Sequence, residues 1–419
     1  MKPYWIKKSF VAFPLLLLAI AGCNKNLVSI ASQPVILPSD GGQVIAAQNK
    51  FALNLFKQTL QDDNSTSNKL ISPLSVYLDL SMAYNGAAGS TQTAMQQAMQ
   101  LNGIDTNLLN QTNQSLISGL PKTDPHIALN IANSIWYRDQ GFQPLSDFLK
   151  MTSNFYNAEV NAADFSNPAT VGKINNWVAA KTNQEIKTII QNIDPDDIMY
   201  LINAVYFKGQ WKYSFDPNKT QNKPFYTIGN GVVQTPFMTQ TATFKYMADD
   251  SAQCIELPYG NGDFNMYVLL PNQPISLQGF ISNLNENTLS SYLSTTDSLT
   301  IQLQLPRWEY SYEVQDMKPE LTSMGMGNAF TSQANFSNMY PPAAGAYISK
   351  VIHKTYIEVN EQGTEAAAAT AVGMATYSLD PDLPMVMDVN RPFLYVIAEK
   401  NTGVILFIGE VNNPAEGSH

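Results

Sequence analysis

The chain has 419 residues, of which 44% are hydrophobic and 14% are charged, and its formal net charge is −10. This composition excludes a disordered chain, because it can bury a large core, and the acidic balance argues against nucleic-acid binding. No interior stretch rich in Pro, Gly and Ser divides the apolar pattern, so we expect one large mixed domain rather than the roughly two or three that length alone suggests.

In the first 22 residues, a basic start precedes an apolar run from Phe10 to Ala21, and small residues stand directly before Cys23. This pattern is typical of a bacterial lipoprotein signal peptide. The run is shorter than the roughly 18 residues of a membrane-spanning helix, and the small residues suit a signal peptidase. Cys23 would then become the first mature residue and carry acyl chains, several of which anchor a protein stably where one would not. The alternative is an ordinary secretory signal that happens to end near a cysteine.

Residues 23–45 are expected to form the lipidated N-terminus and a tether, with Pro34, Pro38 and Gly41-Gly42 in it. Cleavage after residue 22 removes three lysines and no acids, which leaves 21 basic and 34 acidic residues and a charge of −13. We therefore expect a protein of the bacterial cell envelope that is lipid-anchored to a membrane through Cys23 and has no nucleic-acid partner. Asn24 is not the aspartate that retains many lipoproteins at the inner membrane, which favours the outer membrane or the cell surface.

The remaining chain is expected to form one domain over residues 46–414, followed by a tail over residues 415–419. The acidic runs Asp62-Asp63 and 194–197 are typical of solvated turns rather than metal sites. Apart from Cys23 the only cysteine is Cys254, so we expect no disulfide in the mature chain. The apolar neighbourhood of Cys254 predicts a buried strand residue.

No catalytic site is evident in the sequence. The three histidines, at positions 126, 353 and 419, have no second ligand at zinc spacing. There is no Gly-x-Ser-x-Gly elbow, no phosphate-binding loop and no nucleotide fingerprint that opens a helix after a strand. We therefore expect no metal and no cofactor, and no enzyme activity, although composition alone leaves a Ser-His-Asp arrangement open.

The segment from Val359 to Val372 consists of a strand-like lead, a glycine, a threonine and then mostly small side chains. Because alanine is the best helix former, one interpretation is a short exposed helix capped by Thr364. The other interpretation is an extended segment, in which Thr364, Ala366, Ala368 and Thr370 share one small, uncharged face. Such a segment can enter a β-sheet, because nothing on that face is too large or too charged to bury.

Several segments then occur in the order typical of one family. They are Asn68-Lys-Leu-Ile-Ser-Pro-Leu-Ser with Tyr84-Asn-Gly-Ala-Ala, Leu201-Ile-Asn-Ala-Val-Tyr-Phe-Lys-Gly-Gln-Trp, Val351-Ile-His-Lys-Thr, the small-residue segment, Arg391-Pro-Phe-Leu and Phe407-Ile-Gly-Glu-Val-Asn-Asn-Pro. Together they resemble the serpins over about 370 residues. The resemblance implies an α+β serpin fold with a large central β-sheet, two further sheets, about eight or nine helices and an exposed reactive-centre loop at about 361–384.

The resemblance also implies a single-use, metastable inhibitor of serine endopeptidases that acts as a monomer. The target protease would attack the loop, form its acyl-enzyme and be trapped as the cleaved loop inserts into the central sheet. Such loop insertion is a form of β-strand addition. The alternative is a non-inhibitory serpin that acts as a surface binding protein.

Two sets of residues receive roles from this resemblance. The hinge residues would bend and enter the sheet first, and they are Glu361, Gly363, Thr364, Glu365, Ala366, Ala367, Ala368, Ala369 and Thr370. The gate residues would control the opening of the sheet, and they are Ser72, Ser75, Asn203, Trp211, Arg307 and His353. Among these, Glu361 and Arg307 are expected to pair, and Ser72, Ser75, Asn203 and His353 to form a hydrogen-bonded cluster beneath the sheet.

The family's usual spacing places the attacked bond between Tyr377 and Ser378. A tyrosine suits chymotrypsin-like proteases, and the absence of Lys and Arg between Glu365 and Met387 argues against trypsin-like targets. Because the loop is slightly long, Met374, Ala375 and Leu379 remain alternative sites for elastase-like or subtilisin-like enzymes. Papain-like cysteine proteases also remain open as targets.

Overall fold

The structure is a computed structural model that describes residues 1, 32–141, 143–194, 197–229, 231–294, 297–341, 345–364 and 384–416. Ser32–His419 forms one compact unit and Met1–Ala31 another, and only the first is described further. The predictions for Cys23, for the hinge residues from Glu365 onward and for the attacked bond lie outside the described residues. Within the described part of the chain, no helix is both long and apolar enough to span a bilayer.

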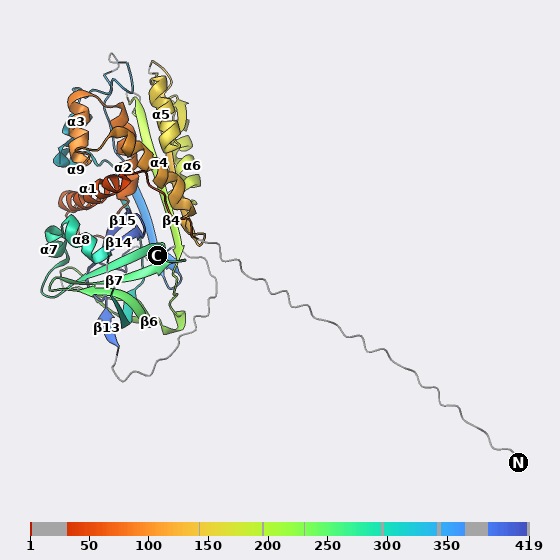
Figure 1. Cartoon of the computed structure of the whole chain (residues 1–419), viewed down its shortest axis with the longest axis vertical. Helices are drawn as coiled ribbons and strands as arrows, with labels where there is room; N and C mark the ends of the chain where they lie inside the picture. Colours follow the sequence, from red (N-terminus) through yellow and green to blue (C-terminus); the bar gives the residue numbers. More distant parts are fainter. Residues whose placement is uncertain are drawn as a thin grey trace. The chain divides into compact units, whose positions relative to one another are not determined.

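The central helix of the fold is α2 (Pro73–Gly86), which is buried on nearly every side. It begins at Pro73, a residue that suits the first helical position because it has no N–H to leave unpaired. Figure 1 shows most helices gathered around it at one end of the unit, with the long strand β4 among them. The other helices are α1 (Gly41–Asp62), α3 (Gly89–Ala98), α4 (Thr106–Thr123), α5 (Ser146–Tyr156), α6 (Ala169–Lys181), α7 (Leu277–Asn283), α8 (Glu286–Leu293) and α9 (Lys318–Leu321).

The central sheet has six strands in the order β10-β11-β12-β4-β2-β3. Buried and partly exposed residues alternate along β11, as expected for a strand with one face on the core. All pairings are antiparallel except the β2–β3 pair. The strands are β10 (Trp308–Val314), β11 (His353–Asn360), β12 (Gly363–Thr364), β4 (Met199–Gln210), β2 (Ile127–Arg138) and β3 (Glu159–Ala163).

The second sheet has nine strands and unites what the sequence predicted as two further sheets. The long strand β6 joins them, because its start pairs with β5, its middle with β9 and its end with β7. The strands are β1 (Lys69–Ile71), β5 (Gln221–Tyr226), β6 (Val232–Ala248), β7 (Ala252–Tyr259), β8 (Phe264–Pro271), β9 (Ser298–Pro306), β13 (Met385–Asp388), β14 (Phe393–Glu399) and β15 (Ile405–Val411). Cys254 lies buried in β7, as predicted.

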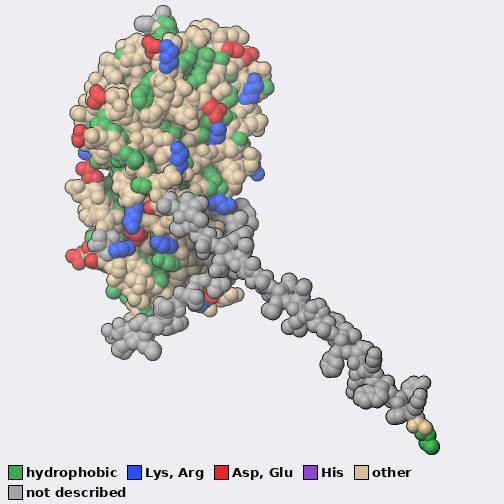
Figure 2. All heavy atoms as spheres, turned by 45° about the vertical axis from the view of Figure 1, so that its right-hand side comes forward, with side chains coloured by type: hydrophobic (Ala, Val, Ile, Leu, Met, Phe, Trp, Pro, Cys, Tyr) green, Lys and Arg blue, Asp and Glu red, His purple; other side chains and the backbone are tan. Residues whose placement is uncertain are grey.

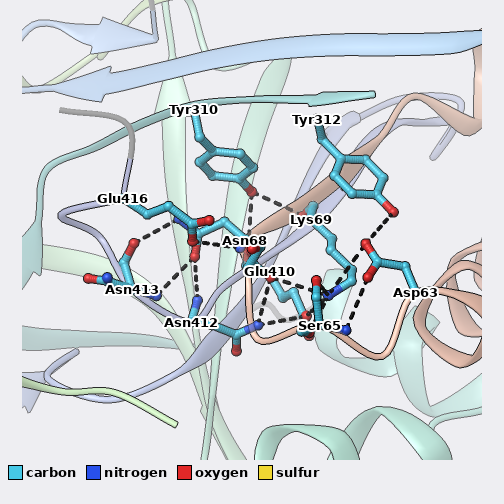
Figure 3. A network of polar contacts seen from close by, with 11 residues as sticks. Asp63, Ser65, Asn68, Lys69, Tyr310, Tyr312, Glu410, Asn412, Asn413 and Glu416 are labelled. Atoms are coloured by element: carbon cyan, nitrogen blue, oxygen red, sulfur yellow. Dashed lines mark hydrogen bonds and ion pairs between the residues drawn. The ribbon is translucent and has the colours of Figure 1, made fainter. Parts of the chain in front are cut away.

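A buried lysine links the two sheets at the start of β1. Lys69 is 1% exposed, and its Nζ donates to the carbonyl oxygen of Ser65 at 2.7 Å and lies 3.7 Å from Glu410 Oε1 and 3.9 Å from Asp63 Oδ2 (Figure 3). Asp63 also accepts a hydrogen bond from the hydroxyl of Tyr312 on β10. Asp63 follows the last residue of α1 with its side chain 38% exposed, and packing also brings the buried cation of Lys69 to it.

The surface is mostly uncharged, in keeping with the low share of charged residues. On the face drawn in Figure 2, Lys and Arg side chains are interspersed with Asp and Glu rather than gathered in one block.

Candidate functional site

The first hinge residues already lie within the central sheet. β12 pairs with β11 on one side, Thr364 opposite Val359, and with β4 on the other, Thr364 opposite Gly209. Thr364 is 2% exposed, and its Oγ1 lies 2.6 Å from the hydroxyl of Tyr259, close enough for a hydrogen bond. Of the two interpretations of this segment, the extended one is correct at Thr364, because a strand residue does not cap a helix.

Gly363 is required by the backbone approach at this point. Its φ of +150° lies in a region that residues with a side chain rarely adopt. A Cβ there would stand 2.0 Å from the carbonyl oxygen of Gly209 on β4. The turn from β11 into β12 can therefore pass this close to β4 only with glycine at position 363.

The carboxylate of Glu361 forms the predicted pair with Arg307 beside this turn. Arg307 Nε donates to Glu361 Oε1 at 2.8 Å, and its Nη2 also contacts that oxygen. The hydroxyl of Thr220 donates to the same oxygen. The Glu361 side chain is 5% exposed, whereas that of Arg307 is 42% exposed. A partly exposed arginine therefore pairs with a buried carboxylate.

Trp211 fixes the β11–β12 turn from the end of β4. Its backbone N–H donates to the carbonyl oxygen of Gln362 at 2.8 Å, and its Nε1 donates to that of Asn360 at 2.9 Å. The indole is stacked on the ring of Tyr259, with 4.4 Å between centroids and 13° between planes. Trp211 and Tyr259 therefore form one aromatic wall beside the inserted Thr364.

The other predicted gate residues gather around a small cavity between β4 and β11. The cavity measures about 10 Å³, enough for about one water molecule, and Ser72, Ser75, Asn203 and His353 all line it. Ile186 and Ile189 also line it. The structure thus brings together the four residues that the sequence placed in one cluster.

The hydrogen bonds of this cluster are fewer than expected. The backbone N–H of Ser72 donates to His353 Nε2 at 3.0 Å, while Asn203 Nδ2 donates to Asn133 Oδ1 at 2.7 Å rather than to the histidine. The Ser72 hydroxyl and Asn203 Oδ1 are buried without a partner in the described chain. Burial lowers the pKa of His353 to about 4, so the imidazole is neutral near pH 7 and can accept the Ser72 bond.

Beyond β12 no strand among the described residues lies between β4 and β11. Over the described residues β4 pairs with β2 along its length and with β12 at two residues, while β11 pairs with β10 and with the same two residues. From Thr364 down to the cavity, no described strand joins the facing edges of β4 and β11. We call this the strand vacancy. A strand that continued β12 into it would run antiparallel to both neighbours.

Comparison with known proteins identifies the family. The family model described as Serpin (serine protease inhibitor) matches residues 46–414. The chain belongs to the serpin family. Serpin B6 of Macaca fascicularis is 35% identical over 381 residues, which cover 88% of this chain and 98% of the relative.

Solved serpin structures confirm the α+β serpin fold. The native state of the thermophilic serpin tengpin matches with a TM-score of 0.82 and 32% identity, over 92% of this chain and 97% of tengpin. Human thyroxine-binding globulin in complex with thyroxine matches with a TM-score of 0.81 and 27% identity, over 89% of this chain and 99% of the globulin. Membership of this family supports a protease-inhibitor function in general, since serpins are mostly inhibitory rather than catalytic.

Three residues of this serpin's site were missed by sequence reasoning. Tyr259 and Thr220 contact hinge residues from distant parts of the chain, 105 and 141 residues away. Asp79 of α2 accepts a hydrogen bond from the backbone N–H of Asn203. A signal existed only for Asp79, as the single charged residue of an otherwise uncharged, buried helix.

Replacing Arg307 with Ala should destabilise the inserted hinge of this serpin. Glu361 would stay buried with Thr220 as its remaining side-chain partner, which we expect to cost about 2 kcal/mol. The measurement is the urea midpoint of the first unfolding transition, compared with Arg307→Lys, which keeps the charge but loses the planar fork. Equal midpoints for wild type and Arg307→Ala would contradict a structural role for the pair.

Proposed function

We propose that this serpin is a suicide-substrate inhibitor of serine endopeptidases. The target cleaves the loop after β12, remains attached as the acyl-enzyme, and is trapped when the cleaved loop fills the strand vacancy. The observation that carries this proposal is the buried strand Gly363–Thr364 between β11 and β4, with the strand vacancy beyond it. The hinge is thus already in the position from which a new strand can extend.

The energy for trapping comes from completing the sheet. About a dozen residues, each gaining ladder hydrogen bonds at about 1 kcal/mol, stabilise the inserted form by on the order of 10 kcal/mol. The native state is therefore metastable, and cleavage of the loop releases the difference. Ala366, Ala368 and Thr370, which would share one face with Thr364 in an extended segment, meet the need of this step, because they are small and uncharged and that face must be buried.

The loop sequence supports chymotrypsin-like targets. We take Tyr377–Ser378 as the attacked bond, with Met374, Ala375 and Leu379 as the sites that elastase-like or subtilisin-like enzymes would use. We further propose that the mature protein is a monomer, lipid-anchored through Cys23 in a bacterial envelope, so that its loop meets proteases at a membrane surface.

The test is incubation of the domain over residues 46–414 with chymotrypsin, followed by denaturing gel electrophoresis and mass spectrometry. We expect a covalent complex that survives denaturation and a released peptide that begins at Ser378. Replacement of Tyr377 with Ala should abolish the chymotrypsin complex. A released peptide that begins at Ala375 or Asp380, together with a covalent complex, would still support trapping but would show that the attacked bond follows Met374 or Leu379.

Clean cleavage with active protease recovered would contradict the inhibitor proposal if an elastase and a subtilisin are also released active. That result would favour the alternative, a non-inhibitory serpin that acts as a surface binding protein.

A further inference from the structure

The carboxyl group of Asp79 reaches the edge of the strand vacancy from beneath the sheet. Asp79 is the only charged residue of α2, and its Oδ2 accepts a hydrogen bond from the backbone N–H of Asn203 on β4 at 3.1 Å. Its Oδ1 is buried and has no hydrogen-bond partner in the described chain. A side chain of a helix thus occupies a hydrogen-bonding position of a strand edge.

The N–H of Asn203 belongs to the edge that faces the strand vacancy. The N–H of Trp211 donates to Gln362, on the β12 side of the strand. Along a strand, every second residue directs its N–H to the same side, and Asn203 precedes Trp211 by eight residues. Asp79 therefore accepts the bond that the carbonyl group of an inserted strand would otherwise accept.

The register of β12 identifies that carbonyl group. Thr364 lies opposite Gly209 on β4 and opposite Val359 on β11. If an inserted strand continued this antiparallel register for six residues, its residue 370 would lie opposite Asn203 and opposite His353. A strand inserted that far needs the Asn203 N–H that Asp79 holds.

We propose that Asp79 is a further gate residue, which holds the β4 edge at Asn203 in place of the inserting strand, and that insertion requires its carboxyl group to be released and neutral. This inference rests on the proposed function and adds a control by pH to the same site. The released carboxyl group would lie beneath a completed sheet, where an ionised form without a partner is strongly disfavoured.

The electrostatics of the native state agree with this role. Burial raises the pKa of Asp79 to about 8, and the Asn203 N–H is the only interaction that lowers it. No charged group on the elements packed around α2 shifts the pKa of Asp79.

The titratable groups near Asp79 that therefore leave its pKa unchanged are Tyr77 and Tyr84 on α2 and those on the elements packed against α2 and on β11. The latter are Lys50, Lys57, Asp62, Lys122, Asp147, Lys150, Tyr156, Tyr200, Tyr206, Lys208, Glu410, His353, Lys354, Tyr356 and Glu358.

The sign of the pH effect follows from linkage. Loss of the Asn203 bond raises the pKa of Asp79 above its native value, so the inserted state binds the proton more tightly. Below about pH 8, Asp79 is neutral in both states and does not affect the rate of insertion. Above about pH 8, the rate falls by up to about tenfold per pH unit, until the pH reaches the pKa of Asp79 in the inserted state.

The experiment compares wild type with Asp79→Asn, which keeps the shape and an acceptor oxygen but cannot titrate. Two quantities are measured between pH 6.5 and pH 9.5 with the same protease: the rate at which the cleaved protein gains thermal stability, and the moles of inhibitor consumed per mole of protease trapped. Dividing each wild-type value by the value for the variant at the same pH removes the pH dependence of the protease itself. We expect the wild-type rate to fall about tenfold relative to Asp79→Asn by pH 9.5, and Asp79→Ala, which also lacks the titrating group, to behave like Asp79→Asn.

The outcomes separate this inference from the proposed function. Trapping with the same pH profile in wild type and both variants would overturn the role of Asp79 and leave the inhibitor proposal intact. A pH-dependent stability gain that is lost in the variants, without trapping of any protease, would support Asp79 as a gate residue and overturn the inhibitor. If Asp79→Asn fails to fold, the wild-type insertion rate is divided by that of Asp79→Ala at each pH. A ratio that does not change with pH would overturn the inference.

Discussion

Replacement of Thr364 with Arg should convert the inhibitor into a substrate. Thr364 is 2% exposed between β11 and β4, and its hydroxyl contacts Tyr259, so an arginine there must either bury an unpaired charge or expel β12 from the sheet. An expelled β12 must enter the sheet again before the loop can insert, and a burial cost of about 3 kcal/mol on that step slows insertion by about 100-fold, which lets hydrolysis of the acyl-enzyme finish first. The measurement is the yield of covalent complex per cleaved inhibitor with chymotrypsin.

Thr364→Ser is the matched control, because it keeps a small side chain and the hydroxyl that contacts Tyr259. It should trap protease nearly as well as wild type. If Thr364→Arg traps protease at the wild-type yield, insertion of Thr364 is not part of the mechanism, and the strand position of the hinge has no functional meaning.

Replacement of Lys69 with Met should destabilise the native fold by about 3–5 kcal/mol. Lys69 is buried against Glu410, whose Oε2 has no partner in the described chain (Figure 3). Burial raises the pKa of Glu410, and Lys69 and a hydrogen bond from Asn412 Nδ2 oppose that rise, so removal of the lysine leaves the buried carboxylate with Asn412 as its remaining side-chain partner. Urea unfolding at pH 7.5 measures the loss.

The pH dependence of this loss has a defined sign. A carboxyl group whose pKa is raised in the fold binds its proton more tightly when folded, so its penalty is full above that pKa and disappears as the pH falls towards the ordinary value for glutamate. The deficit of Lys69→Met should therefore shrink between pH 7.5 and pH 5. The double variant Lys69→Met, Glu410→Gln should recover more than half of it at pH 7.5. A deficit that is equal at both pH values would show that lost packing, and not charge, is its cause.

The sequence predicted those parts of the site that depend on local pattern. The alternation after Gly363 and the small side chains predicted an extended segment that can enter a sheet, and Thr364 lies in a strand. The serpin resemblance predicted the Glu361–Arg307 pair, which the structure contains. The first prediction rests on a short local pattern, and the second on the order of the family's motifs along the chain.

Other contacts could not be predicted, because they join residues that only the folded chain brings together. Tyr259 meets Thr364 through the packing of β7 against the end of β4, and nothing near Tyr259 in the sequence distinguishes it from other buried tyrosines. The merging of two predicted sheets depends on how far β6 extends, since it reaches three neighbouring strands. Strand length and register are set by the partners, which a single sequence does not reveal.

The buried position of Thr364 also has a kinetic consequence. Closing a loop and placing the first residue pair is the slow, nucleating part of adding a strand, since its entropy cost precedes any ladder of hydrogen bonds. In this molecule β12 has already formed that first pair with both neighbours. In the proposed mechanism, insertion of the cut loop is therefore a propagation reaction, in which each further residue gains hydrogen bonds without a new closure cost. Its speed then depends on how readily each successive place in the sheet can be cleared.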